Sequence, residues 1–220
     1  MAYQDFISLV HKSTKRNYVA RVTEYPKAKA AEKAKTWGYD YWDGDRRWGY
    51  GGMKYDGRWS KVAKAMVDHY ELKAGDKILD IGCGKGFLMY DFTQVCPGIE
   101  VFGVDISEYA KENSKDEIQN RITTGSANNL PYSDNEFDFV LSINTLHNLP
   151  CYDLFDALKE MERVGKKNKY ICVESYRSEE EKANLLYWQL TCKAFCSPKE
   201  WEWWFQQTGY CGDHSFIYFE

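Results

Sequence analysis

The sequence predicts an α/β fold: a mostly parallel sheet of six or seven strands with helices on both faces, preceded by a helical segment. Two observations support this prediction. From residue 77 onward, short apolar runs typical of buried strands alternate with longer segments of helical periodicity. A glycine-rich turn connects the first of these strands to the helix that follows it. Such alternation implies parallel strands joined by right-handed crossovers, with helices covering both faces of the sheet.

The chain length limits the domain organisation. With 220 residues, of which 44% are hydrophobic, the protein can bury one substantial core but is short for two full domains. We expect an N-terminal region over residues 1–60 and an α/β domain over residues 61–220. The N-terminal region predicts helices over 5–22 and 27–35, because apolar spacing and alanine content favour them. Residues 38–59 predict a loop with more aromatic side chains than a linker needs.

The α/β domain divides into elements in a regular order. A helix over residues 60–70 precedes the strand KILDIG, and the next helix starts at Gly86. Later strands are expected at 101–106, 121–125, 137–143, 169–175 and 216–220. Later helices are expected at 108–115, 153–164, 179–192 and 197–209, the last beginning with a serine cap and a proline.

Composition excludes several classes of partner. The formal net charge of −4 argues against a protein that binds nucleic acid through a broad positive field. The N-terminal sequence MAYQDFISLVHKSTKRN lacks the pattern of a signal peptide, and no apolar run is long enough to span a bilayer. We therefore expect a cytoplasmic protein that uses neither nucleic acid nor a membrane. Trp201, Trp203 and Trp204 favour a core or an interface, which leaves a homodimer open.

The seven cysteines predict neither disulfides nor a metal site. Their number is odd, and most fall within segments of regular structure, as reduced cytoplasmic thiols do. Cys192 and Cys196 have a helical spacing, but no second Cys or His pair stands nearby to complete four ligands. We expect them to be small buried apolar residues and expect no metal.

The strongest signal is the sequence DIGCGKG at residues 80–86, at a strand-to-helix turn. Its glycines allow a tight turn and close approach of the backbone to a ligand, and the amides that start the helix favour a negative group. Asp105 lies 19 residues beyond Gly86, at the end of the next strand, where a carboxylate can accept hydrogen bonds from both hydroxyls of a ribose. These features predict a ligand that contains a nucleoside.

The glycine spacing distinguishes between two such ligands. Dinucleotide sites use G-x-G-x-x-G, whereas this chain has G-x-G-x-G followed by Phe87. With the preceding acid, LDIGCGKG resembles the first motif of the class I S-adenosylmethionine-dependent methyltransferases. VFGVDIS, GSANNLPYSDNEFDFVLSINTLHNL and KYICVESY resemble the later motifs of that family in the same order. The resemblance covers residues 75–176 and implies a Rossmann-like fold, S-adenosyl-L-methionine as cofactor and S-adenosyl-L-homocysteine as product.

The resemblance also implies which residues hold the cofactor. The positions that match the family motifs are Asp80, Gly82, Cys83, Gly84, Gly86, Asp105, Ile106, Ser126, Ala127, Asn128 and Asn144. The chain departs from the family at Ser126, where an acid commonly contacts the adenine amine. We expect that contact to be weaker, to move to Asn128, or to come from the backbone of Ala127. The family usually ends with two strands after its last helix, whereas this chain has room for one.

The aromatic loop has two interpretations. In small-molecule methyltransferases of this family, the segment before the first strand often forms a lid, and the matching candidates here are Tyr50, Gly51, Gly52, Tyr55 and Arg58. Arg58 can clamp a carboxylate or phosphate of the cofactor or the acceptor. Trp42, Trp48 and Tyr50 can form a pocket for a cation or a ring. The alternative is that these rings only fix the N-terminal helices to the domain.

Candidates for the chemistry lie near the ends of the fourth and fifth strands. His147 is the first candidate for a general base or an acceptor-orienting group, because imidazole titrates near working pH; the alternative is a histidine satisfied by neighbouring backbone. Asn144 and Asn148 can bind cofactor or acceptor, or cap a helix. Glu174 and Tyr176 alternate at the end of the fifth strand, so one of them is expected in the acceptor pocket.

We expect transfer of a methyl group to oxygen or nitrogen of a small polar acceptor. GYDYWDGDRRWGYGG also resembles a segment in methyltransferases of bacterial surface-polysaccharide clusters, which suggests a sugar-linked or phosphorylated metabolite. Two alternatives remain open: a protein or peptide methyltransferase, and a non-catalytic module that binds S-adenosylmethionine.

Overall fold

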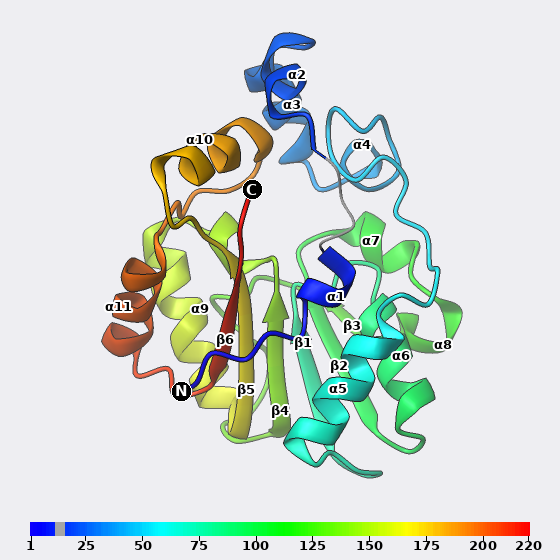
Figure 1. Cartoon of the computed structure of the whole chain (residues 1–220). Helices are drawn as coiled ribbons and strands as arrows, with labels where there is room; N and C mark the ends of the chain where they lie inside the picture. Colours follow the sequence, from blue (N-terminus) through cyan, green and yellow to red (C-terminus); the bar gives the residue numbers. More distant parts are fainter. Residues whose placement is uncertain (12–15) are drawn as a thin grey trace.

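The computed structural model describes residues 1–11 and 16–220. Within these residues, six strands form one sheet in the order β3-β2-β1-β4-β5-β6, and every neighbouring pair is parallel (Figure 1). The strands are β1 (Lys77–Ile81), β2 (Glu100–Asp105), β3 (Ile122–Thr124), β4 (Phe137–Ile143), β5 (Gly165–Glu174) and β6 (Asp213–Ile217). Because all strands run the same way, their carboxyl ends lie along one edge of the sheet.

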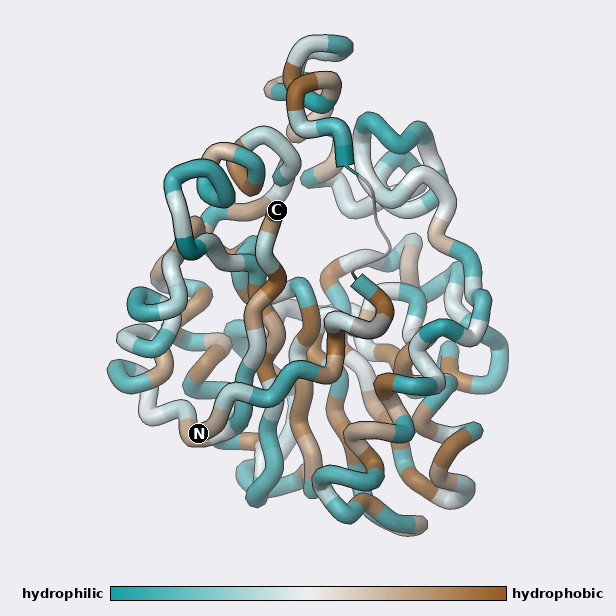
Figure 2. Tube along the Cα trace, in the orientation of Figure 1, coloured by the Kyte–Doolittle hydropathy of each residue, from teal (hydrophilic) through white to brown (hydrophobic). Residues whose placement is uncertain are grey.

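Alternating side chains of the central strands build a core on each face of the sheet. Ile78 of β1 and Tyr170 of β5 join the core on one face, whereas their neighbours Leu79 and Ile171 join the core on the other. The first core is covered by α5 (Ser60–Tyr70) and α6 (Phe87–Val95), and the second by α9 (Cys151–Val164) and α11 (Pro198–Thr208). Figure 2 shows the sheet as the most hydrophobic part of the chain, with hydrophilic segments around it.

The helices begin and end where local hydrogen bonds allow. Ser197 and Glu200 form a capping box at the start of α11, and Gly209 ends that helix in the left-handed conformation. The helix expected over 108–115 is shorter, because the side chains of Asn113 and Ser114 bond back to helix carbonyl oxygens. It forms α7 (Glu108–Glu112), followed by the short α8 (Asp116–Gln119).

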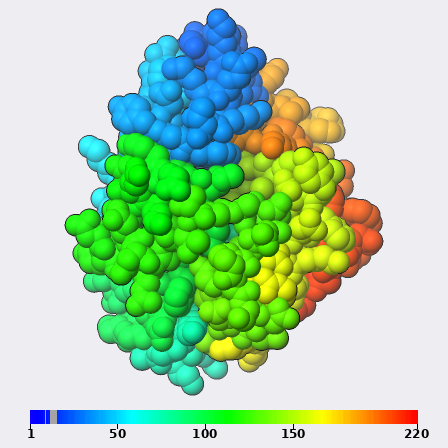
Figure 3. All heavy atoms as spheres, turned by 180° about the vertical axis from the view of Figure 1, so that it is seen from behind, coloured from blue at the N-terminus to red at the C-terminus, as the bar shows by residue number. Residues whose placement is uncertain are grey.

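Four helices lie beyond the carboxyl edge of the sheet. They are α2 (Tyr18–Thr23), α3 (Lys27–Ala34), α4 (Tyr39–Trp42) and α10 (Glu179–Trp188), which we call the cap (Figure 1). Leu190 after α10 packs with Ala30 and Ala34 of α3, and Arg21 of α2 donates to the carbonyl oxygen of Trp188. Figure 3 shows the N-terminal segments closing this end of the molecule beside α10. The cap therefore joins segments far apart in the sequence.

Several expected boundaries differ in the structure. The region 5–22 contains α1 (Ser8–His11) and α2, while residues 12–15 lie outside the described residues. The helix expected to reach residue 192 ends at Trp188, and the extended segment after it lines the site described below. The last strand starts at Asp213 rather than at residue 216, and its other edge pairs with the N-terminus through a bridge between Tyr3 and His214.

Candidate functional site

The ends of four adjacent strands bring candidate residues to one place. Gly82 follows β1, Asp105 ends β2, Asn144 follows β4 and Glu174 ends β5. These strands are neighbours in the order β2-β1-β4-β5, so their carboxyl ends form a continuous row. Open parallel sheets bind ligands at this edge, beside the point where the order of the strands reverses. In this structure the reversal lies between β1 and β4.

A cavity of about 290 Å³ opens above β1, β2 and β4. The expected cofactor residues in its wall are Gly82, Asp105, Ile106, Ser126, Ala127, Asn144 and Tyr50. Asp80 of β1 and Cys83, Gly84 and Gly86 of the turn after it are not part of the wall. We call this space the first cavity.

Close contacts explain the glycines of the turn. A Cβ atom at Gly82 would lie 2.0 Å from Thr145 Oγ1, and one at Gly84 would lie 2.7 Å from the ring of Trp42. Both glycines also have positive φ angles, which side chains disfavour. The turn is held against β2 by hydrogen bonds from the Gly82 and Cys83 N–H groups to the Val104 carbonyl oxygen, at 2.7 and 3.3 Å. Any side chain at Gly82 or Gly84 would therefore collide with Thr145 or Trp42, so the turn needs glycine at both positions to keep this conformation beside the cavity.

The carboxylate of Asp105 is fixed by the backbone. Its two oxygens accept hydrogen bonds from the Gly84 N–H at 2.7 Å and the Ser107 N–H at 2.8 Å. Each carboxylate oxygen can accept a second bond, so both remain able to receive a ribose hydroxyl. Burial raises the pKa of Asp105 despite these donors. Burial also raises the pKa of Asp80 to about 7, and repulsion from Asp105 adds to that shift.

An acid lies near the position where Ser126 departs from the family pattern. Asp153, at the start of α9, lines the first cavity together with Ser126 and Ala127. Its Oδ1 atom accepts a hydrogen bond from Asn128 Nδ2 at 2.6 Å. Asn128 therefore orients a carboxylate instead of lining the cavity itself. Sequence reasoning missed Asp153, which comes from another element and from outside the matched motif positions.

A second cavity, of about 370 Å³, adjoins the first beneath the cap. The two share wall residues Tyr41, Tyr50, Asn144, Asn148 and Thr191. The Oδ1 atoms of Asn144 and Asn148 are buried and find no hydrogen-bond partner among residues 1–11 and 16–220. Asn144 also has a φ of 57°, an uncommon conformation for a residue other than glycine. Unpaired amide oxygens and a strained backbone at a shared wall indicate a place that a ligand completes.

His147 and Glu174 line the second cavity and are both buried. The Glu174 N–H donates to His147 Nδ1 at 3.4 Å, and Gln189 Nε2 donates to Glu174 Oε1. Glu174 Oε2 is buried; among the described residues it has no well-aligned hydrogen-bond donor, and His147 Nε2 lies 3.3 Å from it. Burial lowers the pKa of His147 to about 3 and raises the pKa of Glu174 to about 8. Tyr176 lies apart from this pair, and its hydroxyl contacts Glu200 at 3.4 Å.

The aromatic loop contributes to both cavities and is tied to the glycine turn. Trp42 stacks on Tyr50 with ring centroids 5.4 Å apart, and both rings line the first cavity. The buried Lys85 of the turn bonds to Asp43 of the loop at 2.7 Å. The aromatic loop therefore both holds on to the glycine turn and forms part of the cavity wall.

Among the remaining candidates in the aromatic loop, two line the second cavity and two pack elsewhere. Gly52 and Arg58 line the second cavity, and Arg58 pairs with Asp56 at 2.5 Å. Arg58 thus lies on the second cavity, away from the expected cofactor side. Tyr55 bonds to Asp91 at 2.6 Å and lies outside both walls. Trp48 packs against α3, with Lys33 Nζ 3.6 Å from its ring centroid.

Other features of the described chain bear on the class of site. Across residues 1–11 and 16–220, no three His, Cys, Asp or Glu side chains gather in a way that would hold a metal ion. In the same residues, no helix combines the length and apolar character needed to cross a bilayer. Trp201 belongs to the core, where its Nε1 donates to the Glu174 carbonyl oxygen at 3.0 Å and so supports the second cavity.

Comparisons with known proteins agree with this arrangement. The family model of the methyltransferase domain matches residues 72–209. The chain is 32% identical over 160 residues to the demethylmenaquinone methyltransferase of Staphylococcus carnosus, covering 67% of this chain and 66% of that protein. It is 35% identical over 128 residues to the enzyme of that name from Symbiobacterium thermophilum, covering 54% and 50%. The chain therefore spans between half and two thirds of the length of these relatives.

Solved structures share the fold at lower identity. YcgJ from Bacillus subtilis superposes with a TM-score of 0.55 at 24% identity, covering 66% of each chain. The [4+2]-cyclase SpnF superposes with a TM-score of 0.55 at 17% identity, covering 76% of this chain and 62% of SpnF. Likeness at these identities shows the fold alone. The family match, in contrast, covers more than half of the sequence and includes the glycine turn, Asp105 and Asn144, so the chain belongs to the class I S-adenosylmethionine-dependent methyltransferase family.

Proposed function

We propose that this protein transfers the methyl group of S-adenosyl-L-methionine to an oxygen or nitrogen atom of a small-molecule acceptor. The observation that carries the proposal is the meeting of two cavities at a wall that includes Tyr50, Asn144 and Asn148. Direct transfer needs donor and acceptor side by side and shielded from water. Adjoining cavities beneath a cap provide that arrangement.

The residues of the first cavity fit the cofactor. Asp105 has acceptor capacity left for two ribose hydroxyls, and Asp153 presents a carboxylate beside Ser126 for an adenine amine. The unpaired oxygens of Asn144 and Asn148 suit the positive end of the ligand, since amide oxygens stabilise positive charge. When bound, S-adenosyl-L-methionine supplies a methyl carbon activated by a positive sulfur.

The protein's own part in the chemistry is to orient the acceptor and to take its proton. Glu174 Oε2 is a suitable proton acceptor, because its carboxyl lines the second cavity, has a pKa raised to about 8, and keeps a lone pair beyond the one that faces His147 Nε2 at 3.3 Å. His147 is less suitable, since burial keeps its pKa at about 3 and its Nδ1 atom already accepts a backbone hydrogen bond. We therefore assign proton transfer to Glu174 and a supporting role to His147.

The size and surroundings of the second cavity favour a free small molecule. A volume of about 370 Å³ lies in the usual range for small-molecule sites. Its wall includes residues of the N-terminal helices, the aromatic loop and the segment after α10, so an acceptor there is surrounded from several sides. This arrangement favours a metabolite over a side chain of a folded protein.

The relatives' names offer one acceptor class, a quinone, and the aromatic loop suggests another, a phosphorylated or sugar-linked metabolite. The second cavity contains Arg16, Arg21 and Arg46, which favour the negatively charged member of this set. We therefore propose a polar acceptor with an anionic group. Turnover with a quinone in the assay below would favour the other class.

Calorimetry followed by a turnover assay tests the proposal. We expect the protein to bind S-adenosyl-L-homocysteine with measurable heat, and to release that product from S-adenosyl-L-methionine when an acceptor is present. The acceptor panel should contain carboxylates, phosphate esters, quinones and peptides. No heat with either cofactor form would contradict the proposal. Tight binding with no turnover across the panel would favour a non-catalytic module instead.

A further inference from the structure

Three arginines gather around one tryptophan in the second cavity. The guanidinium carbons of Arg16, Arg21 and Arg46 lie 5.5, 5.1 and 5.2 Å from the ring centroid of Trp188. All four residues line the cavity. Arg16 and Arg21 come from the N-terminal segment, Arg46 from the aromatic loop and Trp188 from the end of α10. We call this group the arginine cluster.

The positive charge of the arginine cluster is not neutralised by the protein. Among the carboxylates in the described part of the chain, none forms an ion pair with any of the three guanidinium groups. By contrast, Arg47 and Arg58 pair with Asp45 and Asp56. Arg16 and Arg21 are half-buried and Arg46 is exposed, and like charges held close together are unfavourable unless an anion joins them.

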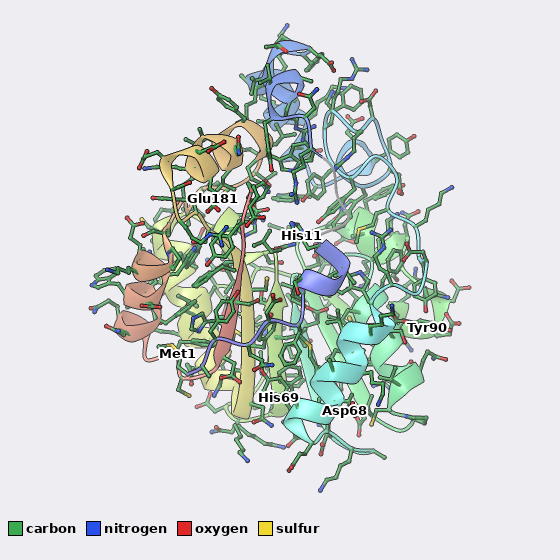
Figure 4. The ribbon with its side chains drawn as sticks, viewed as in Figure 1. Met1, His11, Asp68, His69, Tyr90 and Glu181 are labelled. Carbon is green, nitrogen blue, oxygen red and sulfur yellow. The ribbon has the colours of Figure 1, made fainter. Side chains whose placement is uncertain are left out.

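The surrounding titratable groups leave this charge in place. Burial, with repulsion from Arg46 as the second cause, lowers the pKa of Arg21 only to about 10, so its guanidinium stays protonated at neutral pH. His11, at the end of α1 below the cap in Figure 4, contacts Arg16. Burial and the charge of Arg16 lower the pKa of His11 to about 4, which leaves it uncharged. The raised pKa of Glu174 keeps most of that carboxyl neutral as well.

Hydrogen bonds to backbone carbonyl oxygens hold two arginines of the cluster in place. Arg21 donates to the carbonyl oxygens of Trp188, Arg46 and Arg47 at 3.2, 2.8 and 3.0 Å, so it connects α2 to α10 and to the aromatic loop. Arg46 donates through one nitrogen to the Gly49 carbonyl oxygen. The Nε atom of Arg16 is buried and has no hydrogen-bond partner in the part of the chain that the structure describes. A buried donor without a partner beside a cavity indicates a group that a ligand satisfies.

We propose that the arginine cluster binds a carboxylate or phosphate group of the methyl acceptor. This inference rests on the proposed function, because it assigns the acceptor to the second cavity. Guanidinium groups bind both anions through paired hydrogen bonds, and positions fixed by the backbone lower the cost of binding. The shared chemistry is an oxyanion on a small molecule.

The arginine cluster also determines how the acceptor lies. Its arginines line the second cavity and are absent from the wall of the first, whereas Asn144 and Asn148 belong to both. An acceptor whose anionic end is held by the arginines therefore has its other end free to reach the shared wall. Glu174 lines the same cavity and can take a proton there. The anion thus serves to position the reacting atom.

The test uses inorganic phosphate and acetate as separate probes, each titrated into the whole protein by calorimetry. Arg46→Met and Arg16→Met each remove one charge from the arginine cluster and keep an apolar stem. Arg47→Met is the matched control, because Arg47 is the neighbouring residue, is exposed, pairs with Asp45 and lies outside the cavity wall. Titration with S-adenosyl-L-homocysteine reports separately on the first cavity.

We expect at least one probe to bind the parent protein and to bind each variant of the arginine cluster about tenfold or more weakly. Arg47→Met should bind it within about twofold of the parent, and all variants should keep their cofactor affinity. Preference for phosphate or for acetate identifies the group on the acceptor. Intact cofactor binding with no anion binding, or with equal weakening in Arg47→Met, would overturn the arginine site alone. If the parent protein does not bind S-adenosyl-L-homocysteine, the proposed function itself is overturned.

Discussion

The Nε2 atom of His147 lies 3.3 Å from the Oε2 atom of Glu174, and both side chains are buried where the acceptor cavity meets the end of β5. Since His147 Nδ1 accepts the Glu174 N–H, the neutral imidazole carries its proton on Nε2, facing the carboxyl group. Gln189 donates to the other carboxyl oxygen. The histidine and the glutamine therefore each face one oxygen of Glu174, and Oε2 keeps a second lone pair with which it can take a proton from an acceptor.

The pH dependence of transfer distinguishes Glu174 from His147 as the base. The active form of Glu174 is the carboxylate, and burial raises its pKa to about 8. We expect the rate of transfer to rise about tenfold per pH unit below that pKa and to level off above it. Glu174→Gln should slow transfer by about 10² to 10⁴ and abolish the rise, as measured by product release between pH 5 and pH 9.

The control for that experiment is His147→Gln together with the affinity of each variant for S-adenosyl-L-homocysteine. We expect His147→Gln to keep the rise with pH at a reduced rate, because it disturbs only the orientation of the carboxyl. A flat profile in the parent would point to His147, whose pKa of about 3 leaves it deprotonated throughout this range. Weaker cofactor binding in Glu174→Gln would show that the substitution disturbs the first cavity as well.

The same carboxyl makes stability depend on pH. Between the ordinary pKa of 4.5 and the folded value of about 8, the folded protein keeps a proton that the unfolded chain has lost. The free energy of unfolding therefore falls as pH rises through this window. Subtracting the free energy of unfolding of the parent from that of Glu174→Gln gives one difference at each pH. We expect this difference to be larger at pH 8 than at pH 5, by an amount on the order of a few kcal/mol. Urea unfolding at both pH values measures this difference.

The exposed Glu180 supplies a matched control for the stability experiment. Glu180→Gln should follow the pH dependence of the parent. In Glu174→Gln the free energy of unfolding will still fall as pH rises, although less steeply. The remaining fall comes from Asp80, whose pKa burial raises to about 7. Identical slopes in the parent and in Glu174→Gln would show that Glu174 ionises normally in the folded protein.

The sequence predicts that the glycine turn and Asp105 lie together at one edge of the sheet, because local signals place both of them. The glycine turn and Asp105 each follow directly from a strand, and parallel strands bring their carboxyl ends together. Asp153 was missed because its importance comes from a tertiary contact with Asn128. The helix expected to reach residue 192 ends at Trp188, because Leu190 beyond it packs against Ala30 and Ala34 of α3, a contact that the local sequence does not report.

The acceptor side could not be predicted because its residues meet only in the folded chain. Arg16, Arg21 and Arg46 stand in unrelated segments, and Trp188 joins them from the other end of the sequence. Neither periodicity nor motif spacing reports such a contact. Arg58 was the expected clamp, but its pairing with Asp56 is local and neutralises its charge. His147 is likewise held by residues far from it in the sequence, Glu174 of β5 and the backbone of Lys193 and Ala194.

Removal of the Asp105 charge tests the ribose contact. Asp105→Asn keeps the shape of the side chain but replaces one acceptor oxygen with a donor, so one of the two hydroxyl contacts is lost and the other is weakened. We expect the dissociation constant for S-adenosyl-L-homocysteine to rise about 10- to 100-fold. Calorimetry measures this change, and Glu117→Gln, an exposed acid on α8, provides the control. Equal affinities in the two variants would refute the ribose assignment.

Trp42 tests whether the aromatic loop only stabilises the fold or also forms the cofactor cavity. Its Nε1 atom donates to Ser107 Oγ at 2.9 Å and to the Trp37 carbonyl oxygen at 3.0 Å, while its ring stacks on Tyr50. Trp42→Phe removes the donor and part of the ring. We expect the free energy of unfolding to fall by about 1 to 3 kcal/mol, measured by urea denaturation. We also expect weaker binding of S-adenosyl-L-homocysteine, because the ring lines the first cavity.

The matched control for this substitution is Trp203→Phe on α11, where the side chain is 52% exposed and lines neither cavity. It should leave both stability and cofactor affinity close to those of the parent. A loss of stability in Trp42→Phe with unchanged affinity would mean that the loop only anchors the N-terminal helices. A loss of both quantities supports a wall that the cofactor contacts, since the hydrogen bonds that hold Trp42 to Ser107 also set the position of its ring beside the cavity.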